Sequence, residues 1–158
     1  MKRPWNLPDY PVYSLATYGI EGVNMNICTY VTAISMQPKL YAIAVYDNTK
    51  TLANLKCSSQ VVLQYLHIEQ YNLVRHLGQQ SGLKVNKDQW LRKRKLLTTW
   101  QGMEVLQGAA AYVFLQKIKL VSTKGDHQLF LFEMKKYAAS SSKLLTTKVL
   151  SDKKIIRI

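Results

Sequence analysis

The stretch NMNICTYVTAISMQPKLYAIAVYDNTKTLANL, from Asn24 to Leu55, decides how this chain is expected to fold. Two runs rich in β-branched and aromatic residues, 26–35 and 40–46, lie on either side of Pro38. A polar loop at 47–51 follows the second run and leads into a short helical pattern. This order predicts a strand, a turn, a second strand, a polar loop and the start of a helix.

The end of this stretch has the chemistry of an anion site. Thr49 or Thr51 can cap a brief helix that continues through Leu52 and Leu55. The first N–H groups of a helix have no partner inside it and carry partial positive charge, and Lys50 adds a full charge beside them. Hydroxyl groups, free N–H groups and a lysine together suit a phosphate.

The size of the chain indicates one domain. It has 158 residues, of which 47% are apolar, enough for a sizeable core. We expect a single domain over residues 1–158, with an extended proline-rich arm at 1–13. Residues 138–158, rich in Ser and Lys, are expected to form an extension that is held loosely or exchanged with a partner subunit.

No membrane or export signal is visible in the sequence. No apolar run approaches the roughly 20 residues that cross a bilayer. The first residues carry charge without the apolar segment of a signal peptide. A cytoplasmic protein is therefore the default expectation.

The rest of the chain favours strands. Strand patterns at 14–18, 60–66, 108–121 and 128–137 join the two runs above, and turn residues at 122–126 connect the last two as a hairpin. A helical spacing ends at Gly78, and 79–100 is predicted to be a loop with a short helix. Because strands and helices do not alternate, we expect a mainly β protein, an antiparallel barrel with two or three short helices.

Charge and cysteine content narrow the function classes. The net charge is +13; residues 1–79 hold 6 Lys or Arg against 4 Asp or Glu, and residues 80–158 hold 16 against 5. Such a basic half attracts polyanions without identifying them. Cys28 and Cys57 lack the spacing of a zinc or redox site, so we expect two buried free thiols and no metal. Glycine-rich dinucleotide and P-loop motifs are absent.

Several short motifs in order resemble one family. These are an Asn followed by the strand Val31–Ser35; Pro38 and the apolar strand after it; Lys50, Thr51, Leu52 and Asn54; Gly78, Ser81, Gly82 and Lys87; and Gly125, Asp126 and His127. Over roughly 23–137 the chain resembles the flavin reductase-like family of FMN-binding split barrels. That family also includes archaeal ferric reductases and the small reductase components of two-component monooxygenases.

The resemblance implies an FMN-binding oxidoreductase that is a homodimer, with NADH or NADPH as the electron donor. It implies that the strand 29–35 runs along the flavin ring and that the loop 46–54 surrounds the phosphate. The cofactor-binding residues expected on this basis are Thr29, Val31, Thr32, Ala33, Ser35, Tyr46, Asp47, Asn48, Lys50, Thr51, Asn54 and Ser81. On the ring side, backbone N–H groups rather than side chains would be the usual donors to the polar edge of the flavin.

The resemblance also assigns a role to His127. In the reductases of this family the Gly, Asp, His triplet lies near the nicotinamide, so His127 is the expected catalytic residue, one that positions the dinucleotide. The alternative is that Gly125 and Asp126 form a turn and His127 begins a strand. His67 and His76 are expected to be surface or partly buried residues without a role.

Three matters stay open at this level. The protein could bind flavin without NAD(P)H turnover, or it could be a basic nucleic-acid-binding barrel, with 92–95 (RKRK) as the contact. That run could instead bind the 2′-phosphate of NADPH or be a solvated face. Trp90 stands two positions from where the family places an aromatic, and the basic half is unusual. The choice of dinucleotide and the final acceptor, whether a ferric complex, a partner monooxygenase or oxygen, therefore stay open.

Overall fold

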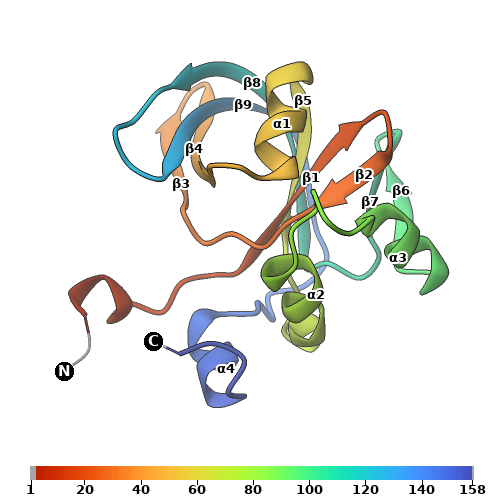
Figure 1. The fold of residues 1–158 in the computed structure, drawn as a ribbon. Helices are drawn as coiled ribbons and strands as arrows, with labels where there is room; N and C mark the ends of the chain where they lie inside the picture. The colour runs from red at the N-terminus through yellow and green to blue at the C-terminus, as the bar shows by residue number, and fades with distance from the viewer. Residues whose placement is uncertain (1–2, 158) are drawn as a thin grey trace.

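Residues 3–157 are described in a computed structural model of the chain, and they form a mainly antiparallel β structure (Figure 1). Its strands are β1 (Tyr13–Gly19), β2 (Gly22–Met25), β3 (Val31–Met36), β4 (Lys39–Tyr46), β5 (Gln60–Tyr65), β6 (Leu97–Trp100), β7 (Met103–Leu106), β8 (Ala111–Val121) and β9 (His127–Ala139). The helices are α1 (Lys50–Cys57), α2 (Leu73–Gln79), α3 (Lys87–Lys93) and α4 (Thr147–Asp152), with 3-10 turns η1 (Pro4–Asn6) and η2 (Ile68–Asn72).

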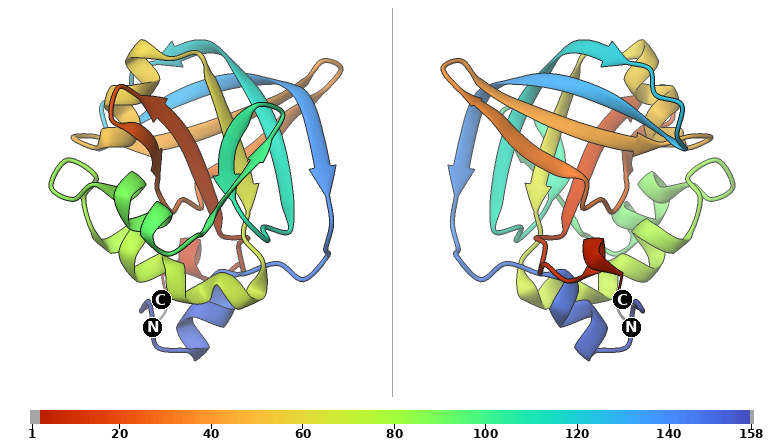
Figure 2. Two further views of the ribbon diagram at one scale, coloured as in Figure 1. Left: turned by 90° about the vertical axis from the view of Figure 1, so that its right-hand side faces the viewer. Right: turned by 90° about the vertical axis from the view of Figure 1, so that its left-hand side faces the viewer.

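The main sheet has the strand order β2-β1-β5-β8-β9-β4-β3, and each neighbouring pair is antiparallel. Figure 2 shows this sheet curled into a barrel, with the β3–β4 hairpin projecting from one end. The two outer strands of the order, β2 and β3, do not pair with each other, so the barrel is split at this seam. The expected antiparallel split barrel is confirmed.

The segment 26–30 crosses the seam between β2 and β3. Tyr13 and Cys28 exchange two backbone hydrogen bonds, each with a donor–acceptor distance of 2.9 Å, and Ala44 N–H donates to the Tyr30 carbonyl at 3.0 Å. The side chain of Asn26 accepts a hydrogen bond from Leu15 N–H at 2.9 Å. The sequence pattern predicts one strand over 26–35. Instead the first half bridges β1 to β4, and only the second half is a strand.

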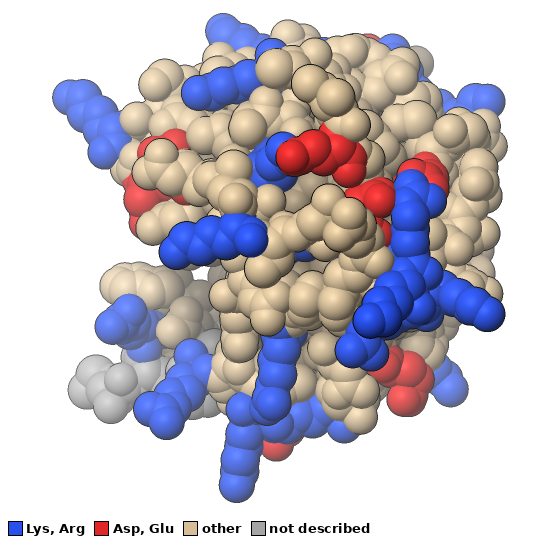
Figure 3. Space-filling model, turned by 45° about the vertical axis from the view of Figure 1, so that its right-hand side comes forward, with Lys and Arg blue, Asp and Glu red and all other residues tan. Residues whose placement is uncertain are grey.

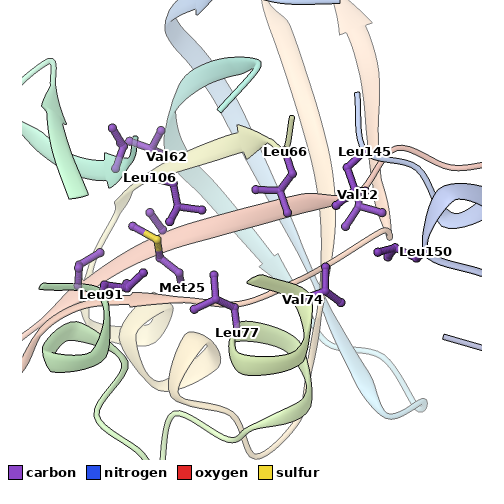
Figure 4. Close-up of a cluster of buried hydrophobic side chains, with 13 residues drawn as sticks. Val12, Met25, Val62, Leu66, Val74, Leu77, Leu91, Leu106, Leu145 and Leu150 are labelled. Carbon is purple, nitrogen blue, oxygen red and sulfur yellow. The ribbon is translucent and has the colours of Figure 1, made fainter. Parts of the chain in front are cut away.

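Two groups of buried side chains lie on opposite faces of β1 and β5. Val61 and Leu63 belong to the cluster inside the barrel, with Phe130 and Phe132 of β9, whereas Val62 points into a second cluster outside it. This follows from the period of two in a strand, and it makes β5 a strand buried on both faces. Figure 4 shows the second cluster, which strands, helices and the C-terminal segment enclose together.

The second cluster explains three features that the sequence pattern did not give. β6 lies at the end of the stretch 79–100 predicted to be a loop with a short helix, and its hairpin partner β7, for which no strand was expected, covers this cluster with Val105 and Leu106. The helix α4 is a fourth helix where two or three were expected. The segment expected to be loose instead packs on its own chain, because Leu145 and Leu150 are buried in the same cluster.

The N-terminal segment lies beside the C-terminal one (Figure 1). Tyr10 N–H donates to Thr147 Oγ1 at 3.0 Å, and the Asp9 carboxylate accepts from Lys148 N–H at 2.8 Å. The expected arm at 1–13 is not extended throughout, since η1 forms within it and Tyr13 begins β1. Met1, Lys2 and Ile158 lie outside the described residues. Within 3–157, no helix has the length and apolar character needed to cross a membrane.

Replacing Leu145 with alanine tests whether the C-terminal segment is part of the core. Leu145 has no exposed surface, so Leu145→Ala should lower the free energy of unfolding by about 2–5 kcal/mol. Urea denaturation measures this change. Leu83→Ala is the control, because Leu83 is 57% exposed and should change stability little. Equal stability of the two variants would show that the segment is loosely held.

Candidate functional site

One cavity of about 580 Å³ opens beside the seam, a volume within the usual range for small-ligand sites. Its walls come from the segment 26–30, here called the seam segment, with the end of β2, from the end of β4 with the start of α1, from the end of α2 with the loop after it, from one residue of α3 and from the start of β9. The residues that line it are Asn24, Asn26, Ile27, Cys28, Thr29, Tyr30, Ala44, Val45, Tyr46, Asp47, Asn48, Thr49, Lys50, Thr51, Leu77, Gly78, Gln79, Gln80, Ser81, Gly82, Lys87 and His127.

The seam segment supplies free backbone donors to this cavity. Within residues 3–157, the N–H groups of Thr29 and Tyr30 make no hydrogen bond to the protein, while the neighbouring Cys28 and Val31 N–H groups do. The segment bridges strands at Cys28 and at the Tyr30 carbonyl, and the two N–H groups between these points are left without a partner in the described chain. Such donors suit a ligand with carbonyl or ring-nitrogen acceptors along one edge.

The start of α1 supplies a second set of donors. Thr49 is the N-cap, and its Oγ1 accepts from Leu52 N–H at 3.2 Å. This agrees with the expectation that Thr49 or Thr51 caps the helix. No partner within residues 3–157 accepts from the Lys50 and Thr51 N–H groups. These two groups, the helix dipole and the Lys50 ammonium together make this wall favourable for an anion.

A buried hydrogen-bond network lies under the helix start. Asn24 Nδ2 donates to Thr51 Oγ1 at 3.1 Å, and Asn54 Nδ2 donates to Thr17 Oγ1 at 3.1 Å. Thr17 Oγ1 in turn donates to the Asn24 carbonyl at 3.2 Å. Asn54 was expected to bind the cofactor, but it does not line the cavity; it belongs to the network that holds Asn24 and Thr51 in place.

Four further expected contacts lie outside the cavity: Val31, Thr32, Ala33 and Ser35. They belong to β3, the edge strand paired with β4, on which Thr32 and Ala33 are exposed. The prediction extended the strand back through residue 26, whereas β3 begins at Val31 and the half of the run before it lines the cavity. Within the run 26–35, the residues that line the cavity are those of the seam segment, 26–30, and of these only Thr29 was an expected contact.

The remaining expected contacts do line the cavity: Thr29, Tyr46, Asp47, Asn48, Lys50, Thr51, Ser81 and His127. The loop at 47–48 is fixed to the β8–β9 turn, because Asp47 N–H donates to the Asp126 carbonyl at 2.9 Å and Asp47 Oδ1 accepts from Gln128 Nε2 at 3.1 Å. In the loop after α2, a Cβ added at Gly82 would lie 2.4 Å from Asn24 Oδ1. That loop therefore comes close enough to the network that only glycine fits.

His127 is both the first residue of β9 and a cavity residue. Its Nδ1 lies 2.7 Å from Asp126 Oδ1, and its ring centroid lies 5.1 Å from that of Tyr30 and 5.2 Å from that of Tyr46. The contact with the histidine lowers the pKa of the Asp126 carboxyl group. A carboxylate at Nδ1 favours the tautomer with its proton there, which leaves Nε2 as the free ring nitrogen. His127 can therefore begin a strand after the turn and line the cavity as well, so the two alternatives for this residue are compatible.

Lys87 is a cavity residue to which the sequence analysis assigned no role. It is only 6% exposed, and its Nζ donates to the carbonyls of Leu77 at 2.7 Å and Met25 at 3.1 Å. Burial lowers the pKa of its ammonium group to about 8. An ammonium has three protons, so one donor remains after these two bonds. The motif with Gly78, Ser81 and Gly82 included Lys87, but its burial was not expected, because lysine is rarely buried.

The two cysteines differ from each other. Burial raises the pKa of the Cys28 thiol to about 12, so this cavity residue stays protonated and is a poor nucleophile. Cys57, the last residue of α1, is exposed, so the expectation of a buried thiol is wrong there. The helix packs against the core through Leu52 and Leu55, and Cys57 is not among its buried residues.

The basic run 92–95, at the C-terminal end of α3, is partly engaged in contacts within the chain. Arg92 pairs with Asp88 and Glu104, each at 2.7 Å, and the Arg94 guanidinium lies 4.9 Å from the Trp90 ring centroid. Trp90 also stacks on His76, with ring centroids 3.7 Å apart. Figure 3 shows Lys and Arg side chains projecting from this side of the molecule beside acidic ones. These pairings favour the solvated-face interpretation of the run.

The sequence matches the family described as "Flavin reductase like domain" over residues 8–153. No curated protein matches the chain by sequence.

Solved structures agree in fold at low sequence identity. An FMN-binding protein from Thermus thermophilus, with bound p-hydroxybenzaldehyde, superimposes with a TM-score of 0.77 at 21% identity, covering 90% of this chain and 78% of that one. An NADH:FAD oxidoreductase from Streptomyces globisporus gives 0.76 at 19% identity, covering 89% and 82%. The styrene monooxygenase flavin reductase from Pseudomonas putida gives 0.69 at 17%, covering 83% and 81%. At these identities the similarity establishes the fold alone.

Replacing Lys87 tests its buried charge. Its folded-state pKa, about 8, lies below its usual value of 10.5. Below pH 8 the folded state carries the whole penalty of burying the charge, and between 8 and 10.5 that penalty is relieved. Native stability should therefore rise, relative to Lys87→Met, by about 1–2 kcal/mol between about pH 7.5 and about pH 9.5.

Urea denaturation of both proteins at the two pH values measures this difference. The matched control is Lys84→Met, because Lys84 is exposed in the loop before α3. That variant should follow the native protein at both pH values. A Lys87→Met difference that stays constant with pH would show that the ammonium is not desolvated.

Proposed function

Because the chain belongs to the flavin reductase-like family, we propose that it is an oxidoreductase that binds FMN in the cavity beside the seam and reduces it with NADH or NADPH. The observation that carries this proposal is that one cavity holds two separate sets of unpaired backbone donors. One set, at Thr29 and Tyr30, suits the polar edge of a planar ring. The other, at Lys50 and Thr51, suits a phosphate.

The residues present fit the charge and shape of FMN. Lys50 and the two N–H groups of α1 would hold the phosphate, with the Thr51 hydroxyl kept in place by Asn24. The Thr29 and Tyr30 N–H groups would orient the flavin ring by its carbonyl and nitrogen edge. Lys87 adds a buried positive charge in the same cavity, which favours an anionic ligand.

Bound FMN would supply the ring that accepts the hydride, and the protein would bind and orient the flavin and the dinucleotide. His127 would position the dinucleotide, because its ring lines the cavity and packs beside the rings of Tyr30 and Tyr46. Orientation of this kind is the contribution a protein makes to hydride transfer between two cofactors, which needs no protein acid or base.

The proposal includes a homodimer. Tyr30, Ile34 and Met36 are 61%, 48% and 83% exposed, along the seam segment and the projecting β3 strand. Large exposed apolar residues gathered on one edge are typical of a surface that a second subunit covers. Reduced flavin would then pass to an acceptor, and a partner protein is one candidate for it.

Titration with FMN, monitored by flavin fluorescence and the visible spectrum, tests whether the protein binds FMN and whether the bound flavin is reduced. We expect saturable quenching at micromolar FMN and bleaching of the bound flavin when NADH or NADPH is added without oxygen. Quenching without bleaching by either dinucleotide would identify a flavin-binding protein without turnover. Unchanged FMN fluorescence would overturn the proposal.

Lys50→Ala tests the phosphate contact. Loss of a charged hydrogen-bond donor should weaken FMN binding roughly tenfold, with riboflavin, which has no phosphate, bound as by the native protein. Lys56→Ala is the matched control, because Lys56 is exposed at the other end of the same helix. An equal effect on riboflavin and FMN would remove Lys50 from the phosphate site.

His127→Ala tests whether His127 helps to bind the dinucleotide. We expect KM for NADH or NADPH to rise about tenfold while the Kd for FMN stays within roughly twofold, because a hydrogen bond to the dinucleotide is lost. His67→Asn is the control: His67 caps η2 outside the cavity, and asparagine is also a good cap. Steady-state kinetics and fluorescence titration separate the two constants. An unchanged KM would exclude the positioning role.

A further inference from the structure

Lys50 is paired with Glu21 at the edge of the cavity. The Lys50 side chain is 24% exposed and the Glu21 side chain is 68% exposed. Lys50 lines both the main cavity and a small adjoining cleft of about 20 Å³, and Glu21 lines only the cleft. The ammonium therefore lies on the boundary between a candidate phosphate site and a carboxylate of the protein itself.

The fold fixes both partners of this pair. Lys50 is the first residue of α1, and a Cβ added at Gly82 would lie 3.0 Å from its Cβ, so the loop after α2 packs against the lysine stem. Glu21 lies in the turn between β1 and β2. That turn is held by Gly22, whose φ is +97° and whose added Cβ would lie 2.5 Å from Asp88 Oδ1.

The other charges near the cleft have partners of their own. Asp88 accepts from Arg92 at 2.7 Å and from Val23 N–H at 3.1 Å, and Lys87 donates to backbone carbonyls. Among the residues the structure describes, Lys50 is the cation that pairs with Glu21, and no second ion pair holds either of them.

We propose that Glu21 is a specificity-determining residue, an internal competitor whose carboxylate occupies the Lys50 ammonium until the phosphate of a flavin displaces it. The inference rests on the proposed function and deepens it. An exposed carboxylate can turn away into water, so the competition weakens phosphate binding without blocking it. Because the carboxylate competes with the phosphate for Lys50, FMN is bound less tightly and can be released. Such binding suits a flavin that exchanges with solution.

Glu21→Gln keeps the size of the side chain and removes its charge. We expect the Kd for FMN to fall about threefold to tenfold and the Kd for riboflavin to stay unchanged, because only FMN meets Lys50 through a dianion. Glu69→Gln is the matched control: it makes the same change in net charge at an exposed glutamate that lines neither the cavity nor the cleft, so it should bind both ligands as the native protein does.

The same titrations in the Lys50→Ala background complete the test. Glu21→Gln should then lose most of its effect on FMN, because the ammonium for which the two anions compete is gone. Equal FMN affinity of Glu21→Gln and native protein, or an equal gain for riboflavin, would overturn the inference and leave the proposed function standing. Failure of every variant and of the native protein to bind flavin would instead overturn the proposed function.

Discussion

The seam of the barrel is the constraint on which the rest of the structure depends. The outer strands β2 and β3 do not pair, so the chain between them must satisfy the open edges of β1 and β4. It does so at Cys28 and at the Tyr30 carbonyl, and the Asn26 side chain satisfies Leu15 N–H. Between these two bridging points, the N–H groups of Thr29 and Tyr30 have no partner within residues 3–157. These groups form one wall of the cavity, so closure of the barrel and formation of the site have the same cause.

The second wall depends on buried polar side chains rather than on the barrel. Asn24, Thr17 and Asn54 connect β1, β2 and α1 beneath the first turn of the helix. Buried polar groups are costly unless each is hydrogen-bonded, so this network holds the helix start in one position relative to the seam. Two independent sets of donors are thereby kept at fixed places in one cavity, which is what recognition of a ligand with a ring and a phosphate requires.

Two lysines of the cavity differ in how their charges are compensated. Lys87 is buried, bonds to backbone carbonyls and has a pKa near 8, so its charge is held in place at the expense of stability. Lys50 is partly exposed and is compensated by a carboxylate that can leave. A buried cation raises the attraction for any anion in the cavity, whereas the Lys50–Glu21 pair acts only where a charged group reaches the edge of the cavity.

The sequence by itself determined the parts of this protein that depend on local pattern: the strands 40–46 and 60–66, the hairpin at 122–126, the helix capped at Thr49 or Thr51, and hence the barrel class and the candidate anion site at Lys50 and Thr51. The short motifs also led to His127. Only the tertiary structure decided that residues 26–30 are a bridge and not a strand, that β6 and β7 form a hairpin over a second core, that Leu145 is buried, that Lys87 is buried in the cavity wall, and that Glu21 pairs with Lys50. Periodicity and capping arise between residues a few positions apart, so the sequence carries them directly. Closure of the seam, burial of a lysine and pairing of Glu21 with Lys50 arise between segments that only the folded chain brings together.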